Sequence, residues 1–201
     1  MTETREPVRR TQAERRRRTR YALLEAAARL LSADGYPNLR LAEVAANAGV
    51  TRGALYHQFD GKEDLALAVV EWVNETWTAE VAVPAAEETG PVAWMEALAR
   101  GHAVYCRRDV AGVMMTLRVE FLGKDSPVGR RITELVGDLI SQTADRIDEG
   151  RKAGVIPPGP PAAEVAEAFF GALEGAMIPL AGKAPHDETV AVRIVRGLLG
   201  V

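Results

Sequence analysis

The stretch VAANAGVTRGALYHQF, residues Val44–Phe59, decides the fold. Its first half predicts a helix that ends at Gly49, where glycine adopts a left-handed backbone conformation at least cost. Thr51 can cap a second, short helix, and Leu55 and Phe59, four positions apart, then face inward together. The outward positions of that helix carry Arg, Gly, Tyr and His side chains. This arrangement predicts a helix-turn-helix whose second helix is shaped to enter a DNA major groove.

Charge is distributed unevenly along the 201 residues. Residues 1–62 hold twelve Lys and Arg against seven Asp and Glu, a formal charge of +5, whereas residues 63–201 hold thirteen against twenty-one, a formal charge of −8. Only the N-terminal part is therefore expected to approach phosphates. We predict a flexible basic arm over residues 1–10, a helix-turn-helix DNA-binding domain over 11–62, and a helical ligand-binding and dimerisation domain over 63–201.

Composition narrows the functional classes. Hydrophobic residues make up 47% of the chain, enough to bury a core, and Cys106 is the only cysteine, which excludes an intrachain disulfide and a multi-cysteine zinc site. No apolar run approaches the length of a membrane span and no signal peptide is apparent, so a cytoplasmic location is expected. The three histidines fall on different elements, and catalytic and dinucleotide motifs are missing. We expect no catalytic residue, no metal and no cofactor.

Helical periodicity without a convincing strand predicts an all-α fold of nine helices. Thr11 and Glu14 form a capping box at the first helix. Asp60 and Asp109 are expected to cap the fourth and sixth helices. The expected helices cover about residues 11–33, 40–48, 51–59, 61–83, 91–105, 109–121, 126–153, 162–180 and 187–199.

The chain resembles the TetR family of transcriptional regulators, the tetracycline-repressor-like proteins, over about Thr11–Leu67. The matching residues are Arg10-Thr11-Gln12-Ala13-Glu14-Arg15, Gly35-Tyr36, Val44-Ala45, Ala48-Gly49-Val50-Thr51, Leu55-Tyr56, Phe59, Lys62 and Leu65. The resemblance implies a dimeric repressor whose C-terminal domain binds a small molecule and thereby releases DNA. One departure is that Leu39 and Arg40 stand where the family often has a capping Thr or Ser, so Asn38 is expected to cap the second helix instead.

Several polar side chains are candidates for contact with DNA. Arg52 either bonds guanine bidentately or contacts a phosphate or only water, Tyr56 and Lys62 are expected at phosphates, and His57 could touch bases, phosphates or water. The predicted DNA-binding set is Arg10, Arg15, Arg40, Thr51, Arg52, Gly53, Tyr56, His57 and Lys62.

The acidic C-terminal part offers two further candidate sites. Large, adaptable side chains suggest a pocket for a largely apolar effector, although each could equally fill a plain core; they are Trp94, Leu98, His102, Tyr105, Met114, Leu117, Arg118 and Phe121. Arg118 is expected to pair with Glu120 or another carboxylate, with an acidic ligand as the alternative. Two apolar stripes, around a Gly171-x-x-x-Gly175 spacing and near the C-terminus, predict the homodimer interface: Phe169, Phe170, Leu173, Met177, Ile194 and Leu198.

These observations predict a ligand-responsive repressor that binds a palindromic double-stranded operator as a homodimer and is released by a small molecule. One alternative is a DNA-binding regulator without small-molecule control, which a dry, closed core would favour. A remote alternative is a helical enzyme, which would need convergent titratable groups. A cavity of a few hundred cubic ångströms would favour the first function.

Overall fold

The computed structural model describes residues 11–201. The predicted arm over residues 1–10, including the candidate DNA contact Arg10, lies outside the described residues. Over the described range the chain forms ten α-helices and one π-helix, without a strand, so the all-α prediction is confirmed. The predicted number of nine helices is wrong, because the polypeptide between the fourth helix and Pro91 continues as a π-turn and a further short helix.

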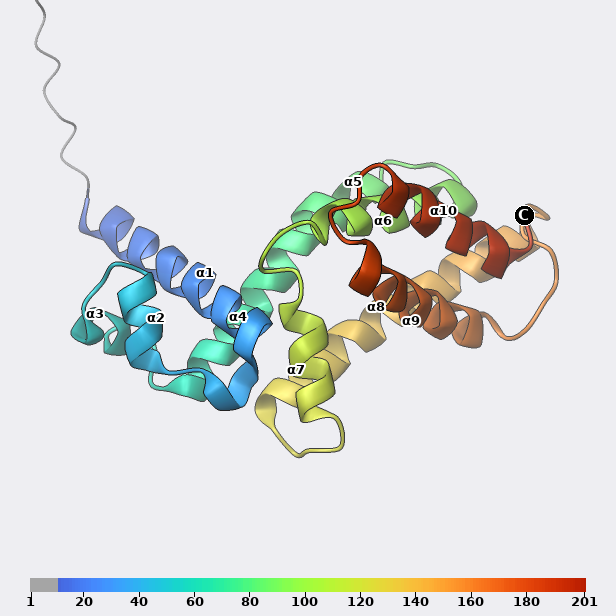
Figure 1. The fold of residues 1–201 in the computed structure, drawn as a ribbon. Helices are drawn as coiled ribbons and strands as arrows, with labels where there is room; N and C mark the ends of the chain where they lie inside the picture. Colours follow the sequence, from blue (N-terminus) through green and yellow to red (C-terminus); the bar gives the residue numbers. More distant parts are fainter. Residues whose placement is uncertain (1–10) are drawn as a thin grey trace, which may run out of the picture.

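Three helices occupy one end of the molecule (Figure 1). They are α1 (Gln12–Asn38), α2 (Leu41–Asn47) and α3 (Arg52–Tyr56). The connecting helix α4 (Lys62–Trp77) leads away from them and continues through the π-helix η1 (Thr78–Ala82) into α5 (Val83–Ala85).

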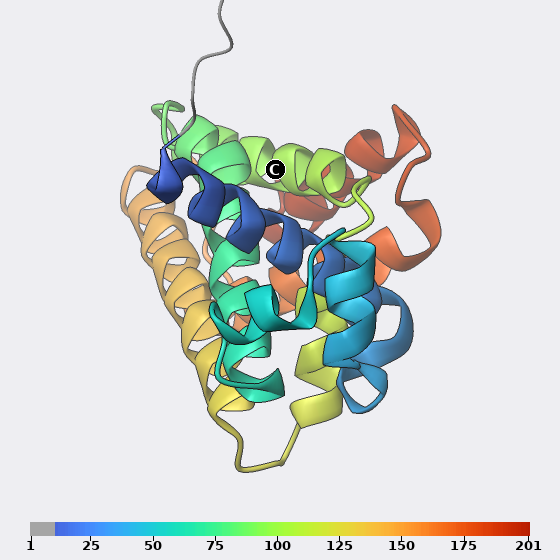
Figure 2. The same cartoon turned by 90° about the vertical axis from the view of Figure 1, so that its left-hand side faces the viewer.

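The larger part of the fold consists of five helices. They are α6 (Pro91–Tyr105), α7 (Val113–Phe121), α8 (Pro127–Lys152), α9 (Ala162–Leu180) and α10 (His186–Leu199). Helices α9 and α10 lie at the end opposite to α3, whereas α7 lies beside α1 and α4 (Figures 1 and 2). Helix α7 is therefore the element of this larger part that reaches back toward the helix-turn-helix.

The helix ends agree with the sequence at some positions and differ at others. The capping box is confirmed, with Thr11 Oγ1 accepting from Glu14 N at 3.2 Å and Thr11 N donating to Glu14 Oε2 at 2.9 Å. Asn38 does not cap α2, because its amide donates to Asp34 O at the end of α1.

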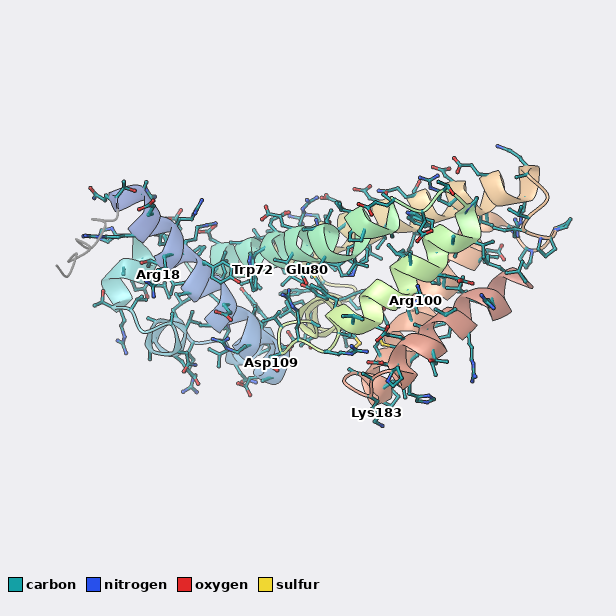
Figure 3. The ribbon with its side chains drawn as sticks, turned by 90° about the horizontal axis from the view of Figure 1, so that it is seen from above. Arg18, Trp72, Glu80, Arg100, Asp109 and Lys183 are labelled. Atoms are coloured by element: carbon teal, nitrogen blue, oxygen red, sulfur yellow. The ribbon has the colours of Figure 1, made fainter. Side chains whose placement is uncertain are left out.

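Two further predicted caps are wrong. Asp60 is not the cap of α4, since its own backbone N–H donates to Asp64 Oδ2 and Gly61 holds the N-cap position. Asp109 does not cap α7, because the chain between α6 and α7 forms successive turns and the helix begins only at Val113. Figure 3 shows Asp109 on this connection.

Two hydrophobic clusters make up the core. The first joins Leu23, Leu31, Val44, Leu55 and Phe59 of the N-terminal helices to residues of α4, α7 and the start of α8, among them Leu65, Val69, Leu117, Val128 and Ile132. The second lies between α6, α8, α9 and α10 and includes Met95, Leu98, Ile147, Phe169 and Val195. This first cluster contains residues from both sides of the predicted domain boundary at residue 62. The predicted DNA-binding segment therefore packs against α4, α7 and α8 through a continuous apolar contact.

Gly35 lets α1 turn toward α7. Its backbone angles, φ 76° and ψ 173°, interrupt the helix in a region that is essentially restricted to glycine. A Cβ atom at this position would lie 2.0 Å from Glu120 Oε1. The glycine therefore serves both the backbone conformation and the close approach of α7.

Candidate DNA-binding surface and effector cavity

The helix-turn-helix has the geometry that the sequence predicts. Gly49 has φ 67° at the turn, Thr51 Oγ1 accepts from Ala54 N at 3.2 Å to cap α3, and Leu55 and Phe59 are buried. Arg20 of α1 donates to Gln58 O and lies over the Phe59 ring, 4.5 Å from its centroid. These contacts hold α3 on α1 and α2.

The outer face of α3 is free of contacts with the rest of the fold. Thr51, Arg52, Gly53, Tyr56 and His57 are all exposed, with Tyr56 exposing 59% of its surface. Arg15 and Arg40 are exposed as well. A helix face with arginine, tyrosine and histidine side chains directed to solvent can reach base edges and phosphates in a major groove.

Lys62 differs from the other predicted DNA contacts because it is half-buried. Its Nζ donates to Pro37 O at 2.9 Å and lies 4.6 Å from the centroid of the Tyr36 ring. Burial and the nearby Glu63 raise the pKa of Tyr36, so its hydroxyl stays neutral beside the lysine. Lys62 thus links the start of α4 to the end of α1, in addition to any role at DNA.

Two adjoining cavities, which we call lobes, lie between α4 and the helices of the larger part of the fold. The first, which we call the aromatic lobe, has a volume of about 110 Å³ and is lined by Val73, Asn74, Trp77, His102, Tyr105, Ala111, Met114, Leu135, Val136, Leu139, Phe170, Leu173 and Glu174. The second, the methionine lobe, has a volume of about 280 Å³ and is lined by His102, Cys106, Ala111, Gly112, Met114, Met115, Glu174, Met177, Ile178 and Ala181. His102, Ala111, Met114 and Glu174 line both lobes, so the two are neighbours.

Three of the eight residues predicted for the pocket line these lobes: His102, Tyr105 and Met114. Trp94, Leu98 and Leu117 are instead buried in the two hydrophobic clusters. Arg118 and Phe121 line a separate groove of about 610 Å³ along α7 and α8. The periodicity of each helix shows which residues face inward, but it does not distinguish a cavity wall from a filled core.

The cavity residues of α4, α8 and α9 were not among those predicted for the pocket from the sequence. Val73, Asn74 and Trp77 come from α4, and Phe170 and Glu174 come from α9. Val73 and Trp77 are four positions apart on the apolar face of α4, which is the only signal that the sequence carries for them.

The histidine in the cavity is neutral. Burial lowers the pKa of His102 to about 4, and its Nδ1 accepts a hydrogen bond from Trp77 Nε1 at 3.2 Å. Its Nε2 lies 3.4 Å from Cys106 Sγ. Burial, with Glu174 and Asp187 nearby, raises the pKa of the Cys106 thiol to about 12, so the sulfur is also uncharged.

The expectation that Arg118 pairs with a carboxylate is confirmed, with Glu174 as the partner. Arg118 Nη1 donates to both carboxylate oxygens, at 2.9 and 2.8 Å. Glu120, the nearer candidate in sequence, instead accepts from Tyr36 N at 2.7 Å. Helix α7 therefore contacts a cavity wall through one side chain and the end of α1 through another.

The residues predicted for the dimer interface divide into two groups. Phe169, Leu173 and Met177 are buried against their own chain and Phe170 lines the aromatic lobe, so these four are not at a free surface. Ile194 and Leu198 are half-buried on α10. Gly171 and Gly175 are exposed on α9, and a Cβ atom at either would meet nothing within 4 Å.

Residues 11–201 contain neither a cluster of metal-ligating side chains nor a membrane-spanning helix. No group of three or more His, Cys, Asp and Glu side chains there could hold a metal ion. Across residues 11–201, no helix combines the length and the hydropathy needed to cross a membrane.

An exposed recognition helix joined to an all-α part with an internal cavity defines the class of helix-turn-helix regulators. Residues 23–69 match the profile described as bacterial regulatory proteins, tetR family. The chain belongs to the TetR family.

Comparisons with individual proteins agree with this assignment. The chain is 47% identical over 72 residues to the HTH-type transcriptional regulator CymR of Pseudomonas putida, covering 36% of each chain. It is 31% identical over 144 residues to the HTH-type transcriptional repressor BepR of Brucella suis, covering 67% of this chain and 66% of BepR. The match thus spans about a third of the length of CymR and about two thirds of BepR.

The whole fold is found among solved structures. The structure of AibR in complex with isovaleryl coenzyme A and operator DNA superposes with a TM-score of 0.73 at 20% identity, covering 90% of this chain and 98% of AibR. Identity at this level establishes the shared fold alone. The matching relatives are regulators and not enzymes.

Proposed function

We propose that this protein is a transcriptional repressor that binds a palindromic operator as a homodimer in the cytoplasm and is released from DNA by a small molecule. The observation that carries the proposal is the course of α4. This helix begins at Lys62, which is bonded to Pro37 beside the helix-turn-helix, and its Val73, Asn74 and Trp77 form one wall of the aromatic lobe. A molecule in the cavity would contact the element that positions the recognition helix.

Helix α7 provides a second connection. Arg118 pairs with Glu174, which lines both lobes, while Glu120 two positions on accepts from Tyr36 N at the end of α1. Displacement of α7 by a ligand would therefore act on α1 as well. A ligand that prefers the displaced arrangement lowers DNA affinity only by its differential affinity for the two states, and a tenfold effect needs about 1.4 kcal/mol.

The homodimer is proposed to form through the outward face of α9 and α10, defined by Ala168, Gly171, Gly175, Val190, Ile194 and Gly197. Small side chains there allow close approach of helices from a second copy, and the same patch on both chains gives a two-fold interface. In such a dimer the two α3 helices would enter successive major grooves, about 34–36 Å apart. We propose Arg15, Arg40, Thr51, Arg52, Gly53, Tyr56, His57 and Lys62 as the DNA-contacting residues, and residues 11–62 and 63–201 as the two functional parts.

Two relatives motivate the small-molecule control. BepR is named a repressor, and AibR was crystallised with isovaleryl coenzyme A together with operator DNA. The decisive experiment selects bound DNA from a random library with the purified protein and measures binding by fluorescence anisotropy, with and without members of a small-molecule library. Selection of a palindrome and its release by a compound that shifts Trp fluorescence are expected. Selection of a palindrome with no compound changing affinity would favour a regulator without small-molecule control, and no selected sequence would refute the proposal.

A further inference from the structure

The polar groups of the cavity are few, and its one charged group is already neutralised. Asn74, Trp77, His102, Tyr105, Cys106 and Glu174 are the lining residues of the two lobes that carry polar side-chain atoms. Both oxygens of Glu174 accept from Arg118, and neither lobe is lined by Lys or Arg. No lining lysine or arginine would replace the water that a carboxylate loses on entering, and Arg118 is already paired with Glu174, which disfavours the charged form of such a ligand.

The hydrogen bond from Trp77 fixes the tautomer of His102. An indole nitrogen is only a donor, so His102 Nδ1 must be an acceptor and cannot carry a proton. A neutral imidazole has one N–H, and in His102 it therefore lies on Nε2. The ring is neutral because burial lowers its pKa to about 4.

The Nε2–H of His102 lacks a strong acceptor in the described fold. Its neighbour is Cys106 Sγ at 3.4 Å, and a thiol sulfur accepts only weakly. The Tyr105 hydroxyl is already engaged, at 2.9 Å from Thr76 Oγ1 and 3.3 Å from Val73 O. The Asn74 amide can both donate and accept, so it can bind a ligand that carries a donor as well as one that carries an acceptor. Among the polar groups of the two lobes, the Nε2–H of His102 is thus the one that can only donate and that has no strong partner.

We propose that the effector is an uncharged molecule with an apolar body and one acceptor oxygen, a ketone, ester or ether, which binds His102 Nε2–H, and that carboxylates are rejected. This inference rests on the proposed function, because it gives the chemical class of the same effector. The apolar body would lie among Trp77, Met114 and Phe170.

The cavity volume limits the size of this body. An apolar cavity of about 150 Å³ holds benzene, whereas the aromatic lobe measures about 110 Å³. A ring with a short substituent exceeds the aromatic lobe, so its binding would also need space from the adjoining methionine lobe of about 280 Å³. Because His102 lines both lobes, a ligand that spans them would contact its side chain.

The test uses three probes of nearly equal shape with the full-length protein. Acetophenone carries the acceptor oxygen, α-methylstyrene replaces that C=O by C=CH₂, and benzoate replaces the methyl group by a charged oxygen. Dissociation constants are measured by calorimetry and compared with the change in tryptophan fluorescence, to which Trp77 of the aromatic lobe contributes. We expect acetophenone to bind about two- to tenfold more tightly than α-methylstyrene, as one hydrogen bond allows, and benzoate to bind least.

Two variants assign the preference to His102. In His102→Gln the amide oxygen can accept from Trp77 and the amide nitrogen can donate to a ligand, so the preference for the ketone should remain. In His102→Met the sulfur can accept weakly from Trp77 but offers no donor, so the preference for the ketone over the olefin should fall to what the Asn74 amide alone supplies. Circular dichroism checks that both variants fold. If either variant fails to fold, the comparison of the three probes on the unaltered protein still tests the proposal.

Equal binding of ketone and olefin to the unaltered protein would overturn the proposal, as would benzoate binding as tightly as acetophenone. An undiminished preference for the ketone in His102→Met, or no binding of any probe up to its solubility, would also overturn it. Operator binding by the unliganded protein is measured on the same samples. Loss of the probe preference with operator binding intact contradicts only the effector class, whereas absence of operator binding contradicts the proposed function itself.

Discussion

Glu120 accepts a hydrogen bond from Tyr36 N at 2.7 Å, which ties the middle of the chain to the end of its first helix. Phe121 adds an edge contact to the Tyr36 ring, with centroids 5.0 Å apart. Tyr36 in turn lies beneath Lys62 Nζ. Tyr36, at the end of α1, therefore contacts both α7 and the start of α4.

The substitution Gly35→Ala should break this junction. A Cβ atom there would collide with the Glu120 carboxylate and would force a non-glycine residue into a strained backbone conformation. Loss of the bond to Glu120 and backbone strain each cost roughly 1–3 kcal/mol, so the free energy of unfolding should fall by several kcal/mol in urea titrations.

The control for Gly35→Ala is Gly154→Ala. Gly154 also has a positive φ, 72°, but a Cβ atom on it meets nothing within 4 Å. Gly154→Ala should therefore lower the free energy of unfolding by less than Gly35→Ala does, through backbone strain alone. Equal losses for both variants would show that the contact between Glu120 and α1 contributes nothing.

Arg52 is predicted to read a base. It is exposed at the first position of α3, where a guanidinium can bond the two acceptors of guanine. Arg52→Ala should cost roughly 1–3 kcal/mol on the selected operator and relax preference at one position per half-site, while binding to scrambled DNA changes little. An equal loss on both DNAs in anisotropy titrations would place Arg52 at a phosphate instead.

Lys62→Ala should act differently. If Lys62 contacts a phosphate, affinity falls for every sequence and the slope of log K against log salt flattens by about one unit per half-site. Lys62 also bonds Pro37 O, so thermal unfolding is measured in parallel. An unchanged salt slope with reduced stability would show that the lysine serves only the contact between α1 and α4.

The proposed dimer surface predicts the effect of Gly171→Arg. Gly171 is exposed on α9 with open space at its Cβ, so the single chain should fold normally, whereas a guanidinium on the two-fold interface should prevent association. Gly137→Arg on α8 is the matched control, since Gly137 is also an exposed helical glycine with open space. Sedimentation should give a dimer for the control and a 21.7 kDa monomer for Gly171→Arg; a dimer for both would exclude this surface.

The sequence predicts local structure well where chemistry within one turn decides it. Thr11, Glu14, Gly49 and Thr51 act as caps and turn residues because their partners lie three or four positions away. The outward direction of Arg52 follows from the inward direction of its neighbours on a short helix.

Pairings between distant segments are not visible in the sequence. Arg118 and Glu174 are separated by 56 positions, so the sequence predicts a carboxylate partner for Arg118 but not which carboxylate it is. Likewise, Phe169 and Phe170 are adjacent and both apolar, yet the first is buried in the core and the second lines a cavity. Which apolar side chains leave space between them depends on how five helices cross, and the periodicity of a single helix does not show that.

Acid should destabilise the protein through His102. Burial lowers the pKa of this imidazole to about 4, against 6.5 for the ordinary group. Its neighbours do not favour protonation, because the Cys106 thiol is uncharged and Glu174 is paired with Arg118. Between these two pH values the unfolded chain binds a proton that the folded chain does not. Stability is therefore full above about pH 6.5 and falls as pH drops toward 4, by about 3 kcal/mol at most. His102→Gln, which cannot titrate, should lose less stability over this range in urea titrations at successive pH values. Parallel curves for the two proteins would mean that the histidine is protonated equally easily in the folded and unfolded states, which contradicts its burial as a neutral donor in the cavity.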